Sequence, residues 1–440
     1  MVSHNFDFQT SSKSILRVSD NGRFLVKTSD GKPFFWLGDT AWELFHRLTR
    51  EEATDYLENR KQKEFTVIQA VAVAELDGLN TPNPYGELPF HNKNPKTPND
   101  AYFQHVDYIV NTAEEKGLFI GFLPTWGTHV NSGVINAANA RTYGQYLGNR
   151  YKDKTNIIWI NGGDRNPPGK EKVWREIAAG LAEGDGGKFL ITYHPNGGSS
   201  SSSFFHNEEW LDFNMLQSGH TSLDLANYTA IESDYAKSPP KPILDGEPRY
   251  EDHPVSWNPA NGYFRDYDVR QAAYWALFAG AFGHTYGHHS IWQMWAPGRM
   301  SVNFPDRYWY DALDRPGAAD MIHVRNLMLS RPFLNRVPDQ SIINGNTGSG
   351  ADRLQATRTD EYLFVYASTG QNFTINLGKI SGSNVKIWWY DPRNGSNTYI
   401  GEFSNSGTRI FKPPGSQSRG NDWILVIDNA SKNFSAPGQI

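Results

Sequence analysis

Two stretches decide the fold: NIIWINGGD at Asn156–Asp164 and PILDGE at Pro242–Glu247. Each is a short apolar run that ends in a carboxylate. Apolar runs of this length, bounded by turn residues, are typical of strands buried on both faces, as in parallel sheets. Functional groups of such sheets gather at the carboxyl ends of the strands, so we expect Asp164 and Glu247 to lie at one edge.

The same pattern continues on both sides of these stretches. Strands are predicted at Phe34–Gly38, Phe65–Ala72, Leu118–Pro124, Asn156–Asn161, Phe189–His194, Phe213–Ser218, Pro242–Glu247 and Phe282–Tyr286. Helical periodicity is found at Arg50–Glu64, Ala101–Lys116, Ala137–Tyr151, Lys170–Glu183, Leu223–Ala236, Asp266–Ala279 and Ala319–Ser330. Thr49 and Glu52 have the spacing of a capping box for the first helix. Eight strands alternating with helices predict an α/β fold, the (β/α)₈ barrel.

The sequence changes character beyond Pro332. Short β-type runs with turns between them occupy Leu354–Arg358, Tyr362–Ala367, Phe373–Asn376, Val385–Tyr390, Asn397–Glu402, Thr408–Lys412 and Trp423–Asp428. They predict a smaller C-terminal β-sandwich, which gives a barrel domain over 14–334 and a sandwich domain over 335–432.

Three further segments are placed less directly. Ser14–Thr28 has a β-type pattern and is expected in either the sandwich or the floor of the barrel. Ala74–Asp100, rich in Asn and Pro, predicts an insertion over the barrel mouth, and Gly198–Ser203 (GSSSSS) predicts a mobile surface loop.

Composition excludes several classes of function. The formal charge is −5, so there is no basic surface for nucleic acid, and the chain has no cysteine for disulfides or thiolate chemistry. No apolar run approaches the roughly 18 residues of a transmembrane helix. The start, MVSHNFDFQTSSKS, lacks the layout of a signal peptide, so we expect either a cytoplasmic protein or a mature form.

A pair of carboxylates at two strand ends is what a glycosidase requires. Retaining enzymes place one protonated and one ionised carboxyl group roughly 5–5.5 Å apart. Asp164 could instead cap a helix or pair with an arginine. Asp245 is an alternative to Glu247, because period-2 alternation points both to one face, but it would lie deeper in the barrel.

Other polar and aromatic residues follow predicted strands and suit a sugar pocket. The candidates for substrate binding are Asp39, Trp126, His194, Gln217, His220, His288, His289 and Trp292. Trp36 and Trp42 are expected in the core or at its edge.

No cofactor is expected. A GxSxG elbow, a phosphate-binding GxxxxGK[ST] loop and a GxGxxG motif after a strand are all missing from the sequence. A metal-dependent hydrolase would draw its ligands from His284, His288, His289, His194 and His220. Their spacing matches no metal motif.

Several motifs resemble one known family. They are the run from Phe34 to Gln69, beginning FFWLGDTAWELF, then NPYGELPF at Asn83–Phe90, IIWINGGDRNP and PILDGEPRYE. They are similar to glycoside hydrolase family 140, the apiosidase-like barrels, over about Ser14 to Val337. The tail resembles a β-sandwich that is named for collagen binding.

The resemblance implies a pectin-active enzyme that removes β-linked apiose from side chains of rhamnogalacturonan-II, and a periplasmic or extracellular location if a leader was removed. It implies that Asp164 in NGGD is the general acid/base and Glu247 in DGEP the nucleophile. The resulting prediction is a retaining glycoside hydrolase whose partner is a polysaccharide or oligosaccharide. Another specificity on the same barrel, or a catalytically silent carbohydrate-binding protein, remains an alternative. The oligomeric state is left open.

Overall fold

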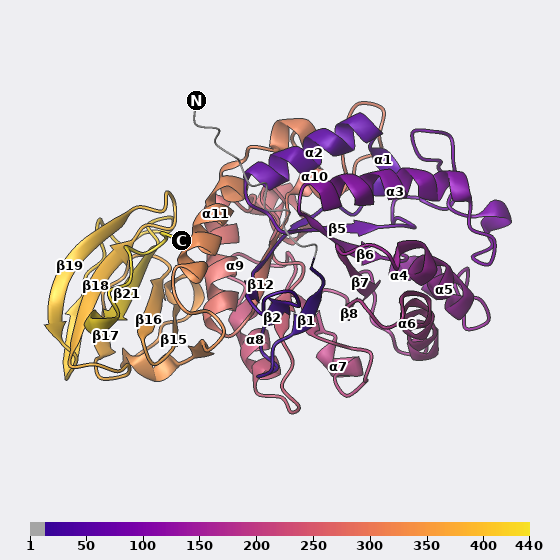
Figure 1. Cartoon of the computed structure of the whole chain (residues 1–440). Coiled ribbons are helices and arrows are strands. Elements are labelled where there is room, and N and C mark those ends of the chain that lie inside the picture. The colour runs from indigo at the N-terminus through magenta and orange to yellow at the C-terminus, as the bar shows by residue number, and fades with distance from the viewer. Residues whose placement is uncertain (1–13) are drawn as a thin grey trace, which may run out of the picture.

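Parallel strands surrounded by helices form the larger part of the computed structural model, which describes residues 14–440 (Figure 1). An antiparallel β-domain lies beside it and contains the C-terminus. The first thirteen residues, for which we expected no signal peptide, lie outside the described residues.

The barrel strands are β4 (Trp36–Thr40), β5 (Val67–Val71), β6 (Phe119–Leu123), β7 (Ile157–Gly162), β8 (Ile191–His194), β10 (Asn214–Gln217), β11 (Ile243–Asp245) and β12 (Gly283–Tyr286). Six pair in parallel in the order β12-β4-β5-β6-β7-β8, and β10 pairs in parallel with β11. Single backbone hydrogen bonds bridge the two seams. The Asp212 amide donates to the Ile191 carbonyl (2.9 Å), and the Phe282 amide donates to the Ile243 carbonyl (3.0 Å). The predicted (β/α)₈ barrel is confirmed.

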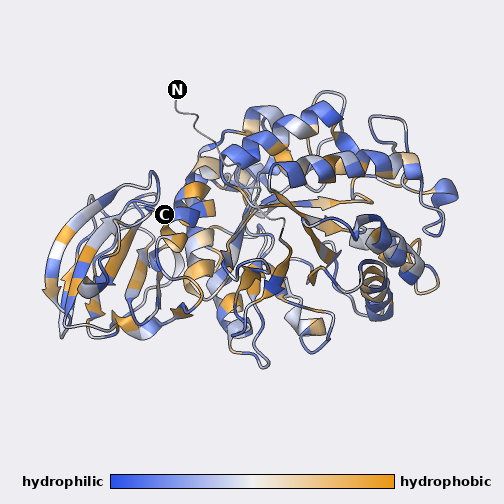
Figure 2. Ribbon diagram, viewed as in Figure 1, coloured by the Kyte–Doolittle hydropathy of each residue, from blue (hydrophilic) through white to orange (hydrophobic). Residues whose placement is uncertain are grey.

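Hydrophobic residues gather on the central strands, while much of the outer helical surface is hydrophilic (Figure 2). The helices are α1 (Leu44–Arg47), α2 (Arg50–Gln62), α3 (Asp100–Glu115), α4 (Gly127–Asn131), α5 (Ala140–Tyr151), α6 (Glu171–Asp185), α7 (Ser202–Phe205), α8 (Asn227–Tyr235), α9 (Asp266–Phe278), α10 (His289–Trp292) and α11 (Pro316–Leu329). The capping box at the start of α2 is present, with Thr49 accepting from the Glu52 amide and Glu52 from the Thr49 amide. It satisfies two amides that a helix start otherwise leaves without partners.

The N-terminal segment belongs to the floor of the barrel. It forms a small sheet of β1 (Leu16–Val18), β2 (Leu25–Lys27) and β3 (Pro33–Phe34). β3 ends two residues before β4 begins, so this sheet lies at the amino end of the barrel strands. The ring of Phe24 packs edge-on against Phe333 at 5.0 Å, which closes this end with apolar surface.

The serine run is not the surface loop that its composition predicted. It forms β9 (Ser199–Ser200), which pairs antiparallel with β10, and the start of α7. The hydroxyls of Ser200 and Ser202 each donate to the buried carboxylate of Asp234 at 2.5 Å. The serines are therefore partners that a buried carboxylate requires, which composition alone cannot reveal.

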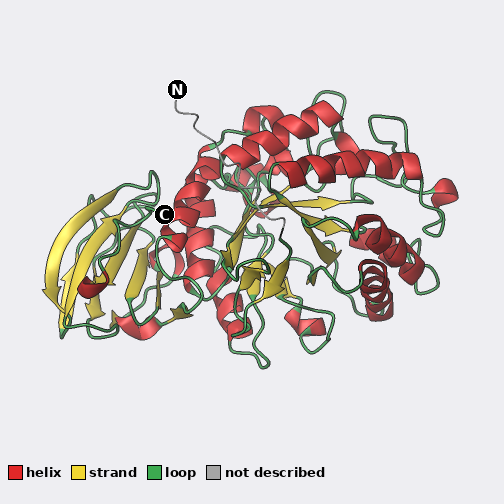
Figure 3. Ribbon diagram, in the orientation of Figure 1, coloured by secondary structure: helices red, strands yellow, loops and turns green. Residues whose placement is uncertain are grey.

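The C-terminal domain is a two-sheet sandwich (Figure 3). One sheet has the order β13-β15-β16-β21-β18-β19 and the other β14-β17-β20. The strands are β13 (Val337–Pro338), β14 (Ile343–Asn344), β15 (Leu354–Arg358), β16 (Tyr362–Ala367), β17 (Phe373–Asn376), β18 (Asn384–Tyr390), β19 (Asn397–Ser404), β20 (Thr408–Phe411) and β21 (Trp423–Asn429). The seven strands predicted for this region are all found.

The larger sheet also packs against α9 of the barrel through β15 and β16, and β16 is buried on both faces. On β16, Leu363 and Val365 join the sandwich core, whereas Phe364 and Tyr366 join the core of the barrel side. Tyr366 stacks on Tyr274 of α9 at 5.1 Å. The sandwich is therefore joined to the barrel by aromatic packing.

Candidate active site

A pocket of about 130 Å³ opens at the carboxyl ends of the barrel strands. Its lining comes from loops after seven different strands, which is where a barrel enzyme builds its site. The lining residues are Trp42, Glu75, Trp126, Asp164, Gln217, His220, Glu247, Tyr250, His253, Trp257, Trp292, Val302 and Asn303.

The Gly162-Gly163 pair brings Asp164 to the pocket by a tight turn. All three residues have positive φ, 93°, 107° and 52° in order. A side chain at Gly162 would overlap the carbonyl oxygen of His194, and one at Gly163 would meet the ring of Trp126 at 2.7 Å. Glycine is thus required at both positions by close approach as well as by backbone angle.

The carboxyl group of Asp164 has a raised pKa. Burial, followed by the charge of Glu247, raises its pKa above the ordinary value, although His194 and Arg165 act in the opposite direction. Arg165 Nη1 lies 3.1 Å from Asp164 Oδ2.

Glu247 is held by two imidazoles. Its Oε2 lies 3.2 Å from His194 Nε2, and its Oε1 lies 3.1 Å from His220 Nε2. Burial alone would raise the pKa of Glu247, but the hydrogen bonds and charges of these histidines outweigh it and lower the pKa to about 2. Glu247 is therefore the ionised member of the pair at neutral pH.

His194 connects the two carboxylate-bearing loops. Its Nδ1 accepts from the backbone amide of Asp164 at 3.5 Å. That contact leaves Nε2, which lies 3.2 Å from Glu247 Oε2, as the nitrogen that carries the hydrogen of the neutral ring. One pocket thus contains a carboxyl group whose pKa is raised and a second whose pKa is lowered, a separation of pKa values that acid/base chemistry can use.

Asp245, the alternative to Glu247, points away from the pocket. It is completely buried, and its carboxylate accepts from the Ser218 hydroxyl (2.7 Å) and from Asn227 of α8 (3.1 Å). Asp245 therefore fixes the strand and helix that flank the site.

The residues predicted for sugar binding divide into two groups. Trp126, Gln217, His220 and Trp292 line the pocket, and His194 lies behind Glu247. Asp39, His288 and His289 are absent from the lining.

Asp39, predicted as a sugar-binding residue, lies outside the pocket lining. Asp39 is completely buried, and its Oδ2 accepts from Arg60 Nε and from the Tyr56 hydroxyl of α2, each at 2.6 Å. The reason is alternation, since β4 directs this side chain outward, toward the helical layer.

His288 and His289, predicted at the rim of the pocket, also lie outside its lining. His288 Nε2 lies 3.2 Å from Asp252, and its Nδ1 accepts from the Ser290 amide as a helix cap. His289 Nε2 contacts the Asn303 carbonyl at 2.8 Å, and its ring packs on His253 at 4.4 Å. Both histidines support residues of the pocket wall from behind.

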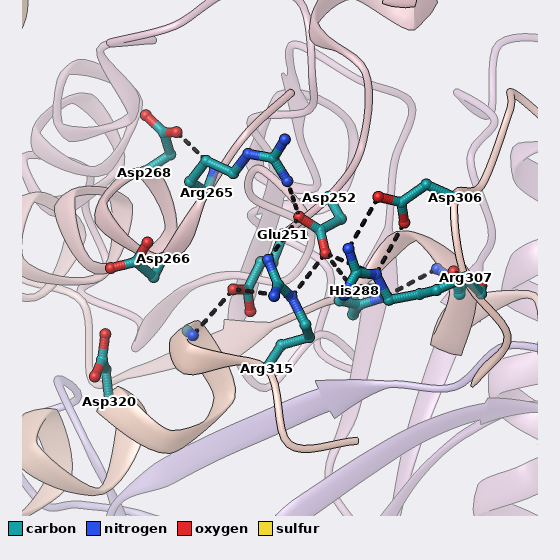
Figure 4. Close-up of polar contacts among 12 residues, drawn as sticks. Glu251, Asp252, Arg265, Asp266, Asp268, His288, Asp306, Arg307, Arg315 and Asp320 are labelled. Carbon is teal, nitrogen blue, oxygen red and sulfur yellow. Dashed lines mark hydrogen bonds and ion pairs between the residues drawn. The ribbon is translucent and has the colours of Figure 1, made fainter. Parts of the chain in front are cut away.

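A charged cluster around Asp252, in the loop after β11, fixes part of that wall (Figure 4). Asp252 Oδ1 accepts from Arg265 at 2.5 Å, and Asp252 Oδ2 lies 2.8 Å from Arg315 and 3.3 Å from Arg307. Burial would raise the pKa of Asp252, but His288 and the guanidinium groups lower it well below its usual range. This anchored residue lies directly before His253, which stacks on His220 at 4.4 Å.

Sequence reasoning missed part of the lining. Trp42 was expected in the core or at its edge, and Glu75, Tyr250, His253, Trp257 and Asn303 were not identified. For Glu75 a signal existed, since it follows the second barrel strand within the insertion expected over the mouth. The others come from loops whose course only the tertiary structure gives.

Within residues 14–440, no group of three or more His, Asp or Glu side chains is arranged to hold a metal ion. His284, one of the histidines considered as ligands, is buried in β12, where burial lowers its pKa to about 3. In the same range, no helix is long and apolar enough to cross a membrane.

Solved structures similar to this chain include glycoside hydrolases. One, described as "Glycoside hydrolase", is 41% identical, with 96% of this chain and 99% of that chain covered and a TM-score of 0.92. Another, a glycoside hydrolase family 5 protein from Bacteroides vulgatus, is 39% identical, covering 96% and 94% of the two chains with a TM-score of 0.91. No curated protein matches the chain. With this fold and this pair of carboxyl groups, the protein is a glycoside hydrolase.

The family follows from two sequence models. The model described as "Apiosidase-like, catalytic domain" matches residues 19–335, and that described as "Putative collagen-binding domain of a collagenase" matches residues 337–428. The chain belongs to the apiosidase-like family, and the resemblance found in its motifs is confirmed.

Proposed function

We propose that the protein is a retaining β-glycosidase that acts on side chains of plant cell-wall polysaccharides. Asp164 is the general acid/base and Glu247 the nucleophile. The observation that carries this proposal is the pair of carboxyl groups on one pocket whose pKa values are shifted in opposite directions.

The reaction has two steps. Glu247 attacks the anomeric carbon while the bond to the leaving oxygen breaks, and Asp164 gives its proton to that oxygen, which leaves a glycosyl ester on Glu247. A water molecule then gives a proton to Asp164 and attacks the anomeric carbon, which releases the sugar and restores the Glu247 carboxylate.

The electrostatics suit both steps. The charge of ionised Glu247 helps to keep the proton on Asp164 before the first step. Esterification removes that charge, so the pKa of Asp164 falls when it must act as a base. His194 and His220 fix the direction of the Glu247 carboxylate throughout.

For the substrate, we propose β-linked apiose of rhamnogalacturonan-II. Membership of the apiosidase-like family supports this choice, and Trp42, Trp126, Trp257 and Trp292 give the pocket aromatic faces on which a sugar can pack. A glycosidase of another specificity would retain the same acid/base pair and differ in the loops around it.

Two measurements test the chemistry. Proton NMR of the first product anomer should show net retention, and we expect the carboxyl groups of Asp164 and Glu247 to lie about 5–6 Å apart. An inverted product would mean that Glu247 activates a water molecule instead of attacking the sugar. If no pectic oligosaccharide were hydrolysed, a carbohydrate-binding protein without catalytic activity would be the better interpretation.

Glu247→Gln and Asp164→Asn should each lower turnover by at least about a thousandfold with the thermal transition preserved. Exposed Asp153→Asn, a matched change in the loop before β7, should have no effect. On a dinitrophenyl glycoside, whose leaving group needs no proton, Asp164→Asn should recover much of the first step and Glu247→Gln should not. Near-normal turnover in either variant on the natural glycoside would contradict the roles assigned.

A further inference from the structure

The pocket contains a third carboxyl group, which the proposed mechanism does not use. Glu75 follows β5 and lines the same cavity as Asp164 and Glu247. Asp164 is paired with Arg165, and Glu247 is held by two histidines. Within residues 14–440, no hydrogen bond or ion pair is made by the carboxyl group of Glu75.

The backbone on both sides of Glu75 is fixed. The carbonyl of Ala74 contacts His129 Nε2 of α4 at 2.9 Å, and the amide of Leu76 donates to Glu43 Oε1 at 3.0 Å. Glu43 is completely buried and also lies 2.6 Å from His46 Nδ1. An anchored backbone with a free carboxyl group in a pocket is the arrangement of a prepared binding residue.

The charges around Glu75 are mostly negative. Asp164 lies on the loop after β7, Glu247 on the loop after β11 and Glu43 on the segment before α1, whereas Arg165 acts in the opposite direction. Burial, followed by these three acidic groups, raises the pKa of Glu75 to about 8. At neutral pH its side chain is therefore a neutral acid, with one O–H donor and a carbonyl acceptor.

Resting on the glycosidase function above, we propose that Glu75 binds the substrate sugar by donating its carboxyl hydrogen to a sugar oxygen and accepting from a hydroxyl with its other oxygen. A neutral acid gives this pocket a donor without adding a negative charge beside the nucleophile. The role differs from that of Asp164, because the proton stays on Glu75 throughout the reaction.

Binding of free apiose, or of the monosaccharide that the enzyme releases, measures this contact without turnover. The four pocket tryptophans supply a fluorescence signal. Wild type should bind with a constant Kd up to about pH 7 and then more weakly as pH rises through about 8. Glu75→Gln, which keeps a donor and an acceptor, should bind with a Kd that does not change over this range. Glu75→Ala should bind roughly tenfold or more weakly at pH 6, because both hydrogen bonds are lost.

A structural role would not produce this pattern. Glu115→Gln, at an exposed carboxylate of α3, is the matched control and should behave as wild type. Glu75→Ala binding within twofold of wild type, or a pH dependence that persists in Glu75→Gln, would overturn the proposal.

Thermal unfolding gives an independent check on the titrating group. The folded pKa is raised, so its stabilising effect is complete below the unfolded value near 4.5 and is lost as pH rises through about 8. Wild type should lose more Tm than Glu75→Gln between pH 5 and 9. Equal losses would assign the titration to another group and overturn the proposal.

The two proposals fail in different ways. If Glu75→Gln binds sugar normally but loses turnover about a thousandfold, Glu75 is a proton donor in catalysis and the binding role is wrong. If Asp164→Asn keeps its turnover while the Glu75 variants bind as expected, the assignment of the acid/base fails and the binding role stands.

Discussion

Replacing Asp39 by alanine tests whether this residue is structural. The change would leave the guanidinium group of Arg60, which is completely buried, without the carboxylate that lies 2.6 Å from its Nε. It would also remove the acceptor of the Tyr56 hydroxyl. Breaking a buried ion pair from one side costs about 3–5 kcal/mol, because an uncompensated charge remains.

For a barrel of this size the loss corresponds to a fall in Tm of roughly 4–8 °C, from an unfolding entropy of about 2 cal/mol/K per residue. Differential scanning calorimetry measures it, and kinetics at 25 °C should show KM within about twofold of wild type. Asp20→Ala is the control, since Asp20 pairs with Arg17 but its side chain is 92% exposed. Its Tm should change by less than about 1 °C. An unchanged Tm together with a raised KM in Asp39→Ala would refute the argument and return Asp39 to the substrate site.

Three further predictions concern the pocket and the sandwich. Gly162→Ala should lower Tm and should lower kcat/KM at least about tenfold, because the added carbon overlaps the His194 carbonyl and displaces Asp164. The control is Gly169→Ala, also at positive φ but in open space, which should leave kcat/KM unchanged. Equal effects of the two substitutions would contradict the steric reasoning. The pH profile of kcat/KM should show no acid limb above about pH 4, because the pKa of Glu247 is about 2. The value of kcat/KM should fall as pH rises through the raised pKa of Asp164. An acid limb near pH 5 would mean that His194 and His220 do not lower the pKa of Glu247 in this way. The buried guanidinium of Arg336 donates to the Ala281 carbonyl at 2.6 Å, so truncation at Arg336 should first lower stability or solubility. Sedimentation and thermal unfolding measure these losses. A truncated protein that is soluble and well folded but inactive would mean that the tail supplies part of the site.

Much of the fold could be predicted from local pattern. The eight barrel strands are found where apolar runs between turn residues placed them, since a strand buried on both faces must be apolar throughout. The capping box of Thr49 and Glu52 was predicted for the same kind of reason, because its hydrogen bonds are made within four residues. The serine run Gly198–Ser203 was predicted wrongly, because the carboxylate of Asp234 that orders it lies about thirty residues further along the chain.

The sequence by itself determined which residues end the barrel strands, and so that Asp164 and Glu247 would lie at one mouth. It could not determine which way a side chain turns at a strand end. Asp39 and Asp245 face the helices, whereas Glu247, two residues beyond Asp245, faces the pocket with His194 and His220. Nor could it show that Glu75 lies in the pocket and that its carboxyl group makes no hydrogen bond or ion pair within residues 14–440. Only the tertiary structure decides these points, because a carboxyl group's direction and pKa depend on partners far away in the sequence, and the charge of each group is set by the others.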